Sequence, residues 1–287
     1  MRRARHHPAV LESRDFWLAN AGRTTLRLGS QQVTDPPGAD DLVKMSSALS
    51  SAQTADVDEA QRRVRVPADE ILLAALGRTI AHTIGEGVVA VDLAGPGRLV
   101  LKPDVDLHRT VGWFTTIYPV PINCSTGGNT SAAETLDEIH RTLNAVPHYG
   151  IGHGLLRYVY APTARQLAAQ PAPDIFFSYV GTIPELPPAQ GPVQFDIDPV
   201  MLVSEVPPGL GHALELRVYR SFAVLHLDWW FDIRRLETAT VEELMAQFPV
   251  ALTELIQESL ASTDEGDEVA EDYEEFALVD LSSLDNT

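Results

Sequence analysis

Residues 212–231 read HALELRVYRSFAVLHLDWWF, and this stretch decides the fold class. Apolar and polar side chains alternate in its first half, with Leu214, Leu216 and Val218 forming the apolar set. Such alternation is the two-residue period of a β-strand with one buried face. The second half has the same character, so we expect an antiparallel hairpin, with the connection at Arg220 and Ser221 although these are not a preferred turn pair.

Weaker signals on both sides of this hairpin predict helices layered on a sheet. Pro119 and Pro121 make the strand at 112–122 an edge strand or an interrupted one, because proline cannot donate to the ladder. Pro249 predicts a kink in the last helix. The expected fold class is α+β, with helices packed on one face of a mixed, largely antiparallel sheet. The other expected elements are strands at 88–93 and 174–180 and helices at 67–84, 131–145 and 241–256.

Composition divides the chain into three parts. Residues 1–65 hold one apolar cluster, then a Pro36-Pro37-Gly38 break and a serine- and alanine-rich run at 46–55, which is typical of an arm or linker. Residues 66–262 carry the regular patterns and form the predicted lobe. Residues 263–287 form an acidic tail that contains ten of the chain's 40 acidic residues and no Lys or Arg.

Charge and cysteine content exclude several functions. The chain has 21 Lys and Arg against 40 Asp and Glu, a net charge of -19, so nucleic acid and anionic membranes are not expected partners. Cys124 is the single cysteine and no Cys/His set has zinc spacing, so neither a disulfide nor a metal site is predicted. No apolar run is long enough for a membrane helix, and we expect a cytoplasmic location.

Five segments follow one another in an informative order. DLHRTVGWFTTIYPV at 106–120 is the most specific, and VPHYGIGHGLLRY at 146–158, FFSYVG at 176–181 and HALELR at 212–217 follow it. FALVDLSSL at 276–284 comes last. Together they resemble the motifs of the condensation/epimerization superfamily of nonribosomal peptide synthetases, in its epimerization branch, and the last segment resembles the linker that trails such domains.

The resemblance implies a fold, a partner and a missing part. Family members have two lobes of chloramphenicol-acetyltransferase type, with a tunnel between them that receives thioesters on the phosphopantetheine arm of a carrier protein. This chain resembles the C-terminal lobe alone, without the N-terminal lobe that carries the HHxxxDG motif, because the cluster Phe16-Trp17-Leu18 resembles the lobe junction. No bound cofactor is expected.

One family residue is replaced at the centre of the expected chemistry. Epimerization takes a proton from one face of an α-carbon and returns one to the other, so two proton-exchanging groups must flank that carbon. The resemblance assigns these roles to a histidine of HHxxxDG and to a glutamate in the motif EGHGR. Residues 91–98 read VDLAGPGR, so Ala94 stands at the glutamate position and Pro96 at the histidine position. We therefore expect no epimerization by this chain alone.

Other residues remain as candidates for a site. His153 in GIGHG, in an expected glycine-rich loop, and Tyr179 in FSYVG are the candidate proton-handling groups. Asp92 and Arg98 either pair with each other or brace the loop around the altered motif. The candidate tunnel lining, for which ordinary core packing is the alternative, consists of Trp113, Phe114, Thr115, Thr116, Tyr118 and Ser178, where serine replaces the family asparagine.

The tail carries apolar residues within its acidic run, a pattern that suits a short segment docking on a basic partner. Its alternative is a plain linker or a segment that packs on its own lobe. The candidate docking residues are Tyr273, Phe276, Leu278, Leu281 and Leu284.

Two functional hypotheses follow. The first is a catalytically incomplete lobe in nonribosomal peptide or hybrid polyketide biosynthesis, which binds a carrier protein, a synthetase subunit or a separate N-terminal lobe. The second is an active enzyme of condensation or acyltransferase type, alone or as a homodimer, acting on carrier-bound thioesters. A homodimer is reasonable because an isolated lobe would expose an apolar face.

Overall fold

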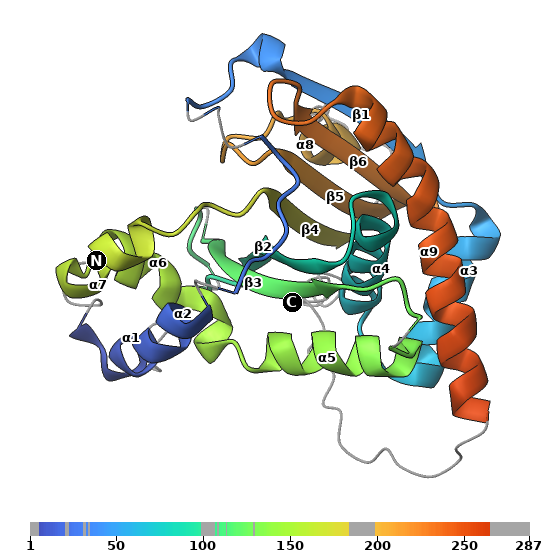
Figure 1. Ribbon diagram of the computed structural model, residues 1–287, viewed down its shortest axis with the longest axis horizontal. Coiled ribbons are helices and arrows are strands. Elements are labelled where there is room, and N and C mark those ends of the chain that lie inside the picture. The colour runs from blue at the N-terminus through green and yellow to red at the C-terminus, as the bar shows by residue number, and fades with distance from the viewer. Residues whose placement is uncertain are drawn as a thin grey trace.

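The computed structural model describes residues 6–20, 23–30, 33, 35–98, 107, 109–112, 114–128, 130–183 and 199–264 (Figure 1). Strands and helices alternate irregularly along this part of the chain. In order they are α1 (Pro8–Glu12), α2 (Arg14–Asn20), β1 (Leu42–Ala48), α3 (Ser51–Val64), α4 (Ala68–Thr83), β2 (Gly87–Gly95), β3 (Thr116–Cys124), α5 (Ala132–Asn144), α6 (Ile151–Tyr158), α7 (Ala161–Ala168), β4 (Ile175–Thr182), α8 (Pro199–Ser204), β5 (Leu214–Ser221), β6 (Val224–Asp232) and α9 (Thr238–Asp264).

The described strands form one six-stranded sheet in the order β1-β6-β5-β4-β2-β3. Strand β4 runs parallel to β2 and to β5, and the other neighbours are antiparallel. The predicted mixed, largely antiparallel sheet is therefore confirmed. Strand β3 is an edge strand, as Pro119 and Pro121 predict, because their missing N–H groups cost nothing on an unpaired side.

Helices α4 and α9 cross one face of the sheet (Figure 1). The alternating residues Leu214, Leu216 and Val218 are fully buried on that face. Trp229 of β6 packs edge to face on Phe248 of α9, with 5.8 Å between ring centroids. Burial of large side chains between these two layers supplies the main driving force for folding.

The hairpin turn lies two residues beyond its predicted position. Arg220 and Ser221 belong to β5, and the turn residues are Phe222 and Ala223, with φ of 48° and 61°. Two left-handed residues give the type I′ turn, whose twist matches that of the flanking strands. Geometry therefore overrides the usual preference for Asn and Gly, and Phe222 is left 77% exposed.

The prediction of an arm or linker across 1–65 also needs correction. Residues 42–48 form β1, which pairs along its length with β6, and residues 51–64 form α3. A capping box starts α3, since the Ser50 side chain accepts from the Gln53 amide and the Gln53 side chain accepts from the Ser50 amide. The serines that suggested a linker are thus the end of a strand and a helix cap.

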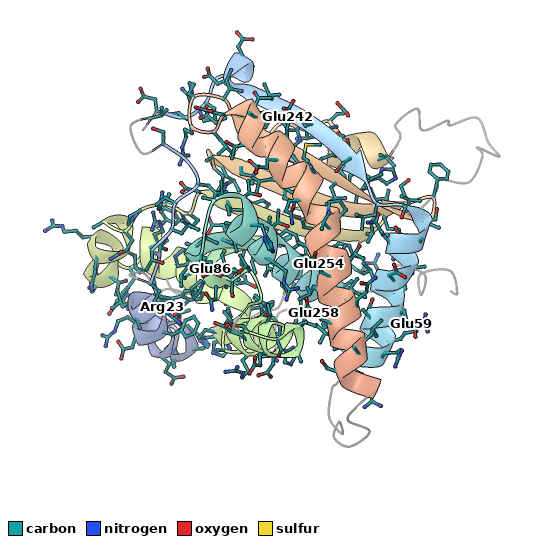
Figure 2. The ribbon with its side chains drawn as sticks, turned by 45° about the vertical axis from the view of Figure 1, so that its right-hand side comes forward. Arg23, Glu59, Glu86, Glu242, Glu254 and Glu258 are labelled. Atoms are coloured by element: carbon teal, nitrogen blue, oxygen red, sulfur yellow. The ribbon has the colours of Figure 1, made fainter. Side chains whose placement is uncertain are left out.

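Helix α9 carries acidic residues and no Lys or Arg, so the negative charge is not confined to the tail (Figure 2). Figure 2 shows Glu242, Glu254 and Glu258 along this helix. The Arg78 guanidinium of α4 donates to both carboxylate oxygens of Glu258, each over 3.0 Å. Within the described residues, no helix has the length and apolarity needed to cross a bilayer.

Candidate functional site

The altered motif VDLAGPGR begins in β2, and its side chains alternate between two faces of the sheet. Val91 and Leu93 are buried on the face that α4 and α9 cover, so Asp92 and Ala94 lie on the other. We call this other side the polar face. Its members include Lys44, Ser46, Asp92, Ala94, Ser178, Glu215, Arg217, Asp228 and Trp230.

Strand register places Ala94 in a row of polar side chains. Leu93 pairs with Phe177, so the next residues along the two parallel strands, Ala94 and Ser178, are neighbours. Ser178 pairs with Arg217, which in turn pairs with Asp228. Ala94 itself is exposed. The methyl group of Ala94 therefore lies beside the Ser178 hydroxyl and one strand away from the Arg217 guanidinium.

The β5–β6 part of the polar face is filled by an ionic network. Arg217 Nε donates to Glu215 Oε1 over 2.5 Å, and its Nη1 donates to the carbonyl oxygens of Val203 and Val206. Lys44 Nζ lies 2.6 Å from Glu205 Oε1 and 3.7 Å from Asp228 Oδ1. These contacts hold α8 and the residues after it against the sheet.

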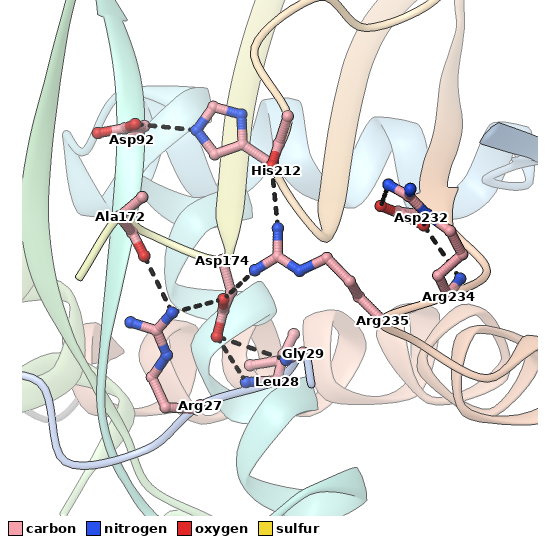
Figure 3. A network of polar contacts seen from close by, with 11 residues as sticks. Arg27, Leu28, Gly29, Asp92, Ala172, Asp174, His212, Asp232, Arg234 and Arg235 are labelled. Atoms are coloured by element: carbon pink, nitrogen blue, oxygen red, sulfur yellow. Dashed lines mark hydrogen bonds and ion pairs between the residues drawn. The ribbon is translucent and has the colours of Figure 1, made fainter. Parts of the chain in front are cut away.

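The β2 part of the polar face keeps one carboxylate, and it is paired with an imidazole (Figure 3). His212 Nε2 lies 2.9 Å from Asp92 Oδ2, and the His212 ring packs on Phe176 with 5.5 Å between centroids. The carboxylate is the acceptor, so Nε2 carries the proton. This pair joins the VDLAGPGR motif to HALELR, and nothing in the sequence indicates it beyond the position of His212 in a motif.

Arg98 braces the loop beside the altered motif and does not pair with Asp92. Its Nη1 donates to the carbonyl oxygens of Leu107 and Thr110 over 2.7 and 2.9 Å, and its Nη2 donates to that of Gly112 over 3.3 Å. The guanidinium also lies 4.6 Å from the Phe114 ring centroid. Of the two roles expected for Arg98, the structure therefore supports bracing of the loop, and the Phe114 ring contributes to this contact.

Three further candidates, Thr116, Tyr118 and Tyr179, lie on the helix-covered face of the sheet. Tyr118 is buried there, and burial raises the pKa of its hydroxyl to about 12. Tyr179 pairs with Val218 and packs against the core, and burial raises the pKa of this hydroxyl as well. Thr116 pairs with Gly95 on this side, and Thr115 is exposed in the loop before it. The sheet therefore separates Tyr179 and Tyr118 from Ala94 and Ser178.

The glycine-rich motif meets the start of β3 at a junction without spare space. Gly150 has φ of +76°, and a Cβ on it would lie 1.9 Å from Tyr118 Cδ1. A Cβ on Gly95 would lie 2.7 Å from the carbonyl oxygen of Tyr149. Two of the five segments that carry the resemblance, 106–120 and 146–158, thus meet VDLAGPGR at one packed corner of the fold.

His153 lies on helix α6 and not in a loop, which corrects the expectation for GIGHG. Its ring packs on Trp17 with 5.0 Å between centroids, and its Nδ1 lies 3.4 Å from the carbonyl oxygen of Ile117, the residue paired with Ala94. The ring is only 8% exposed, and this burial lowers its pKa below the ordinary 6.5. His153 is thus a mostly neutral imidazole at neutral pH.

Some predicted residues cannot be placed. Trp113 and the tail residues lie outside the described part of the chain, and they remain predictions. The tail residues are Tyr273, Phe276, Leu278, Leu281 and Leu284.

The fold and the motif positions define a class, the chloramphenicol-acetyltransferase-like proteins that include condensation and epimerization domains. The condensation domain family matches residues 2–267. The chain therefore belongs to the condensation domain family of nonribosomal peptide synthetases.

Similar proteins are much longer than this chain. It is 57% identical over 286 residues to a component of the phenolphthiocerol/phthiocerol polyketide synthase of Mycobacterium tuberculosis, covering 97% of this chain and 19% of that protein. It is 32% identical over 219 residues to a component of the linear gramicidin synthase of Brevibacillus parabrevis, covering 75% of this chain and 4% of that protein. The chain thus spans less than a fifth of the length of these relatives.

Among solved structures, the epimerization domain from the third module of tyrocidine synthetase B matches with a TM-score of 0.71. Sequence identity is 20%, and the match covers 91% of this chain and 58% of that one. Likeness at this level of identity shows the fold alone.

Proposed function

We propose that this chain is a C-terminal lobe of the epimerization branch that is catalytically incomplete alone and works by binding in a nonribosomal peptide or hybrid polyketide assembly line. The observation that carries the proposal is Ala94, a methyl group on the polar face at the position where the family motif has its carboxylate. The polyketide synthase relative at 57% identity supports the hybrid setting. A cytoplasmic location belongs to the same proposal.

The polar face offers no free replacement for this carboxylate among the residues described. Asp92 is two residues away and is engaged by His212, while Glu215 and Asp228 contact Arg217 and Lys44 respectively. Tyr179, the other candidate, lies across the sheet with a raised pKa. A general base must reach the proton that it removes. The three carboxylates are already paired and Tyr179 lies on the opposite face, so none of them takes the place of a carboxylate at Ala94.

The partner in this proposal is a carrier protein, a synthetase subunit or a separate N-terminal lobe. Condensation domains act on substrates carried on phosphopantetheine, so a thioester on a carrier is the substrate class that the family supports. Residues 263–287 are the proposed docking segment. Residues 66–262 are the proposed lobe, to which β1 and α3 add an edge strand and a covering helix.

A second candidate is an active acyltransferase of condensation type, alone or as a dimer. The Asp92–His212 pair on the polar face is the feature that favours it, because a carboxylate that orients an imidazole occurs in acyl-transfer enzymes. Asp92 occupies Nε2, so proton transfer would require the buried Nδ1 to become accessible to the substrate. Amide formation would not need the glutamate that epimerization uses.

Incubation with an aminoacyl thioester on a carrier protein in deuterated water separates these candidates. We expect neither α-deuterium nor a new amide by mass spectrometry from the chain alone. If a separate N-terminal lobe with HHxxxDG is supplied, Ala94→Glu should allow deuterium incorporation. Ala90→Glu is the matched control, since Ala90 lies on the same strand and face, and it should not. Turnover by the unmodified chain that His153→Ala or His212→Gln abolishes would refute the incomplete-lobe proposal.

Docking by the tail is tested with the same carrier protein and synthetase partners. Replacement of its five apolar residues by serine keeps every acidic charge and should weaken binding as much as deletion of 265–287 does. If deletion weakens binding but the serine variant does not, charge alone attracts the partner. If neither variant changes binding, the interface lies on the lobe.

A further inference from the structure

Asp174, just before β4, is a buried carboxylate with four donors (Figure 3). Its Oδ1 accepts from Arg27 Nη2 and from Arg235 Nη2, each over 2.8 Å. Its Oδ2 accepts from the backbone amides of Leu28 and Gly29 over 3.0 and 3.4 Å. One carboxylate therefore joins the segment 23–30, the start of β4 and the turn between β6 and α9.

Arg235 extends this network to the backbone beside His212. While Nη2 donates to Asp174, its Nη1 donates to the carbonyl oxygen of Gly211 over 2.9 Å. The planar guanidinium fixes both bonds in one plane, so the position of Gly211 depends on that of Asp174. Figure 3 shows the two bonds as a fork from Arg235.

The residue after His212 is held as well. The Ala213 carbonyl oxygen accepts from the Asp232 amide over 3.1 Å. A Cβ on Gly29 would lie 2.7 Å from Ala213 Cβ, so the segment 23–30 packs directly against this residue. The tripeptide from Gly211 to Ala213 is therefore clamped on both sides of His212.

The imidazole at the centre of this clamp has one bond that defines its orientation. His212 Nε2 bonds Asp92, while Nδ1 is buried and has no hydrogen-bond partner among the described residues. A ring with a single hydrogen bond depends on its backbone for the correct position. A small shift of Gly211 would therefore lengthen the contact with Asp92.

We propose that Asp174 and Arg235 are positioning residues of the polar face, which fix the backbone at His212 so that this histidine holds Asp92 beside Ala94. Their importance for activity rests on the proposed function, but the positioning itself does not. A network that served folding alone would tolerate changes at Arg235 without a specific effect on the His212–Asp92 bond.

Imidazole ¹⁵N NMR of the histidine-labelled chain tests this, with the His212 signal assigned from the spectrum of His212→Gln. Arg235→Lys keeps the positive charge but loses the fork, and we expect exchange of the His212 Nε2 proton with water to accelerate about tenfold, the factor for losing one hydrogen bond. Asp174→Asn should act in the same direction. Arg78→Lys is the control, because Arg78 is also a buried arginine that donates through both Nη atoms, but to Glu258 of α9 on the helix-covered face.

The outcomes are distinct. Faster exchange in Arg235→Lys with none in Arg78→Lys supports the proposal. Unchanged exchange in a folded Arg235→Lys overturns it, even if the melting temperature falls, because the network would then serve stability alone. Equal acceleration in all three variants also overturns it, since the effect would be general loosening. None of these outcomes depends on the incomplete-lobe proposal, which the thioester assay tests separately.

Discussion

Replacement of Gly150 by alanine should be among the most damaging single-methyl changes in the glycine-rich motif. The residue has φ of +76°, and the new Cβ would lie 1.9 Å from Tyr118 Cδ1. A left-handed conformation costs a non-glycine residue about 1–2 kcal/mol. Overpacking a rigid core adds about 1–3 kcal/mol. The gain from a stiffer unfolded chain offsets about 0.4–1 kcal/mol.

The net expectation is a loss of about 1–4.5 kcal/mol in the free energy of unfolding. At about 2–4 °C per kcal/mol for a domain of this size class, the melting temperature should fall by about 2–18 °C. Urea unfolding followed by tryptophan fluorescence measures the free energy, and calorimetry measures the melting temperature. Both signals report on the core that holds Tyr118.

Gly154→Ala supplies the matched control, because Gly154 lies four residues away in α6 and a Cβ there meets nothing within 4 Å. Alanine is favoured over glycine inside a helix by about 0.5–1 kcal/mol, so this variant should be slightly more stable than the parent. A lower free energy of unfolding in Gly150→Ala together with a higher one in Gly154→Ala would support close packing of Gly150 on Tyr118. A Gly150→Ala protein within about 0.5 kcal/mol of the parent would show that the contact with Tyr118 relaxes freely, and the reasoning would fail.

Three further predictions concern His153, Arg98 and the turn between β5 and β6. Burial lowers the pKa of His153, so the native state binds fewer protons than the unfolded state, and the free energy of unfolding should fall as the pH drops below about 6.5. In His153→Gln, the difference between the free energies of unfolding at pH 7 and pH 5, measured by urea titration, should be smaller. Arg98→Lys removes the fork that holds three carbonyl oxygens, so limited proteolysis within 107–114 should accelerate, while Arg62→Lys at an exposed site should not change it. Replacing Phe222-Ala223 by Asn-Gly should raise the free energy of unfolding by about 1–2 kcal/mol, because both residues are left-handed, and an unchanged value would contradict the turn assignment.

The sheet and its covering helices could be predicted because their signals are local. The alternation at 214–218 and the prolines at 119 and 121 each determine the environment of a short segment, and both predictions are confirmed. The helix expected at 131–145 depends on a local signal too, since the Ser131 side chain caps it by accepting from the Glu134 amide. Each of these signals involves residues within about four positions of one another, so it can be recognised in the sequence alone.

The errors arise where distant contacts override composition. Residues 42–48 have no strong strand pattern of their own, but they complete the edge of the sheet against β6. The glycines of GIGHG suggest a loop, yet residues 151–158 are helical because α6 packs against α1, α7 and β3. Tertiary packing supplies in both cases what the intrinsic propensity lacks.

The candidate site could not be predicted from local sequence, because two other features decide which residues meet there. One is the order of the strands in the sheet, and the other is the face of the sheet to which each side chain points. Ser178 and Tyr179 are adjacent in sequence, yet the alternation of side chains along β4 places Ser178 beside Ala94 and Tyr179 on the opposite face. Asp92 and His212 are 120 positions apart and meet only because β4 lies between β2 and β5 in the sheet. Ala94 therefore lies on the face that carries the Asp92–His212 pair. The positioning proposal makes the geometry of that pair depend on the two bonds that Arg235 donates, to Gly211 and to Asp174.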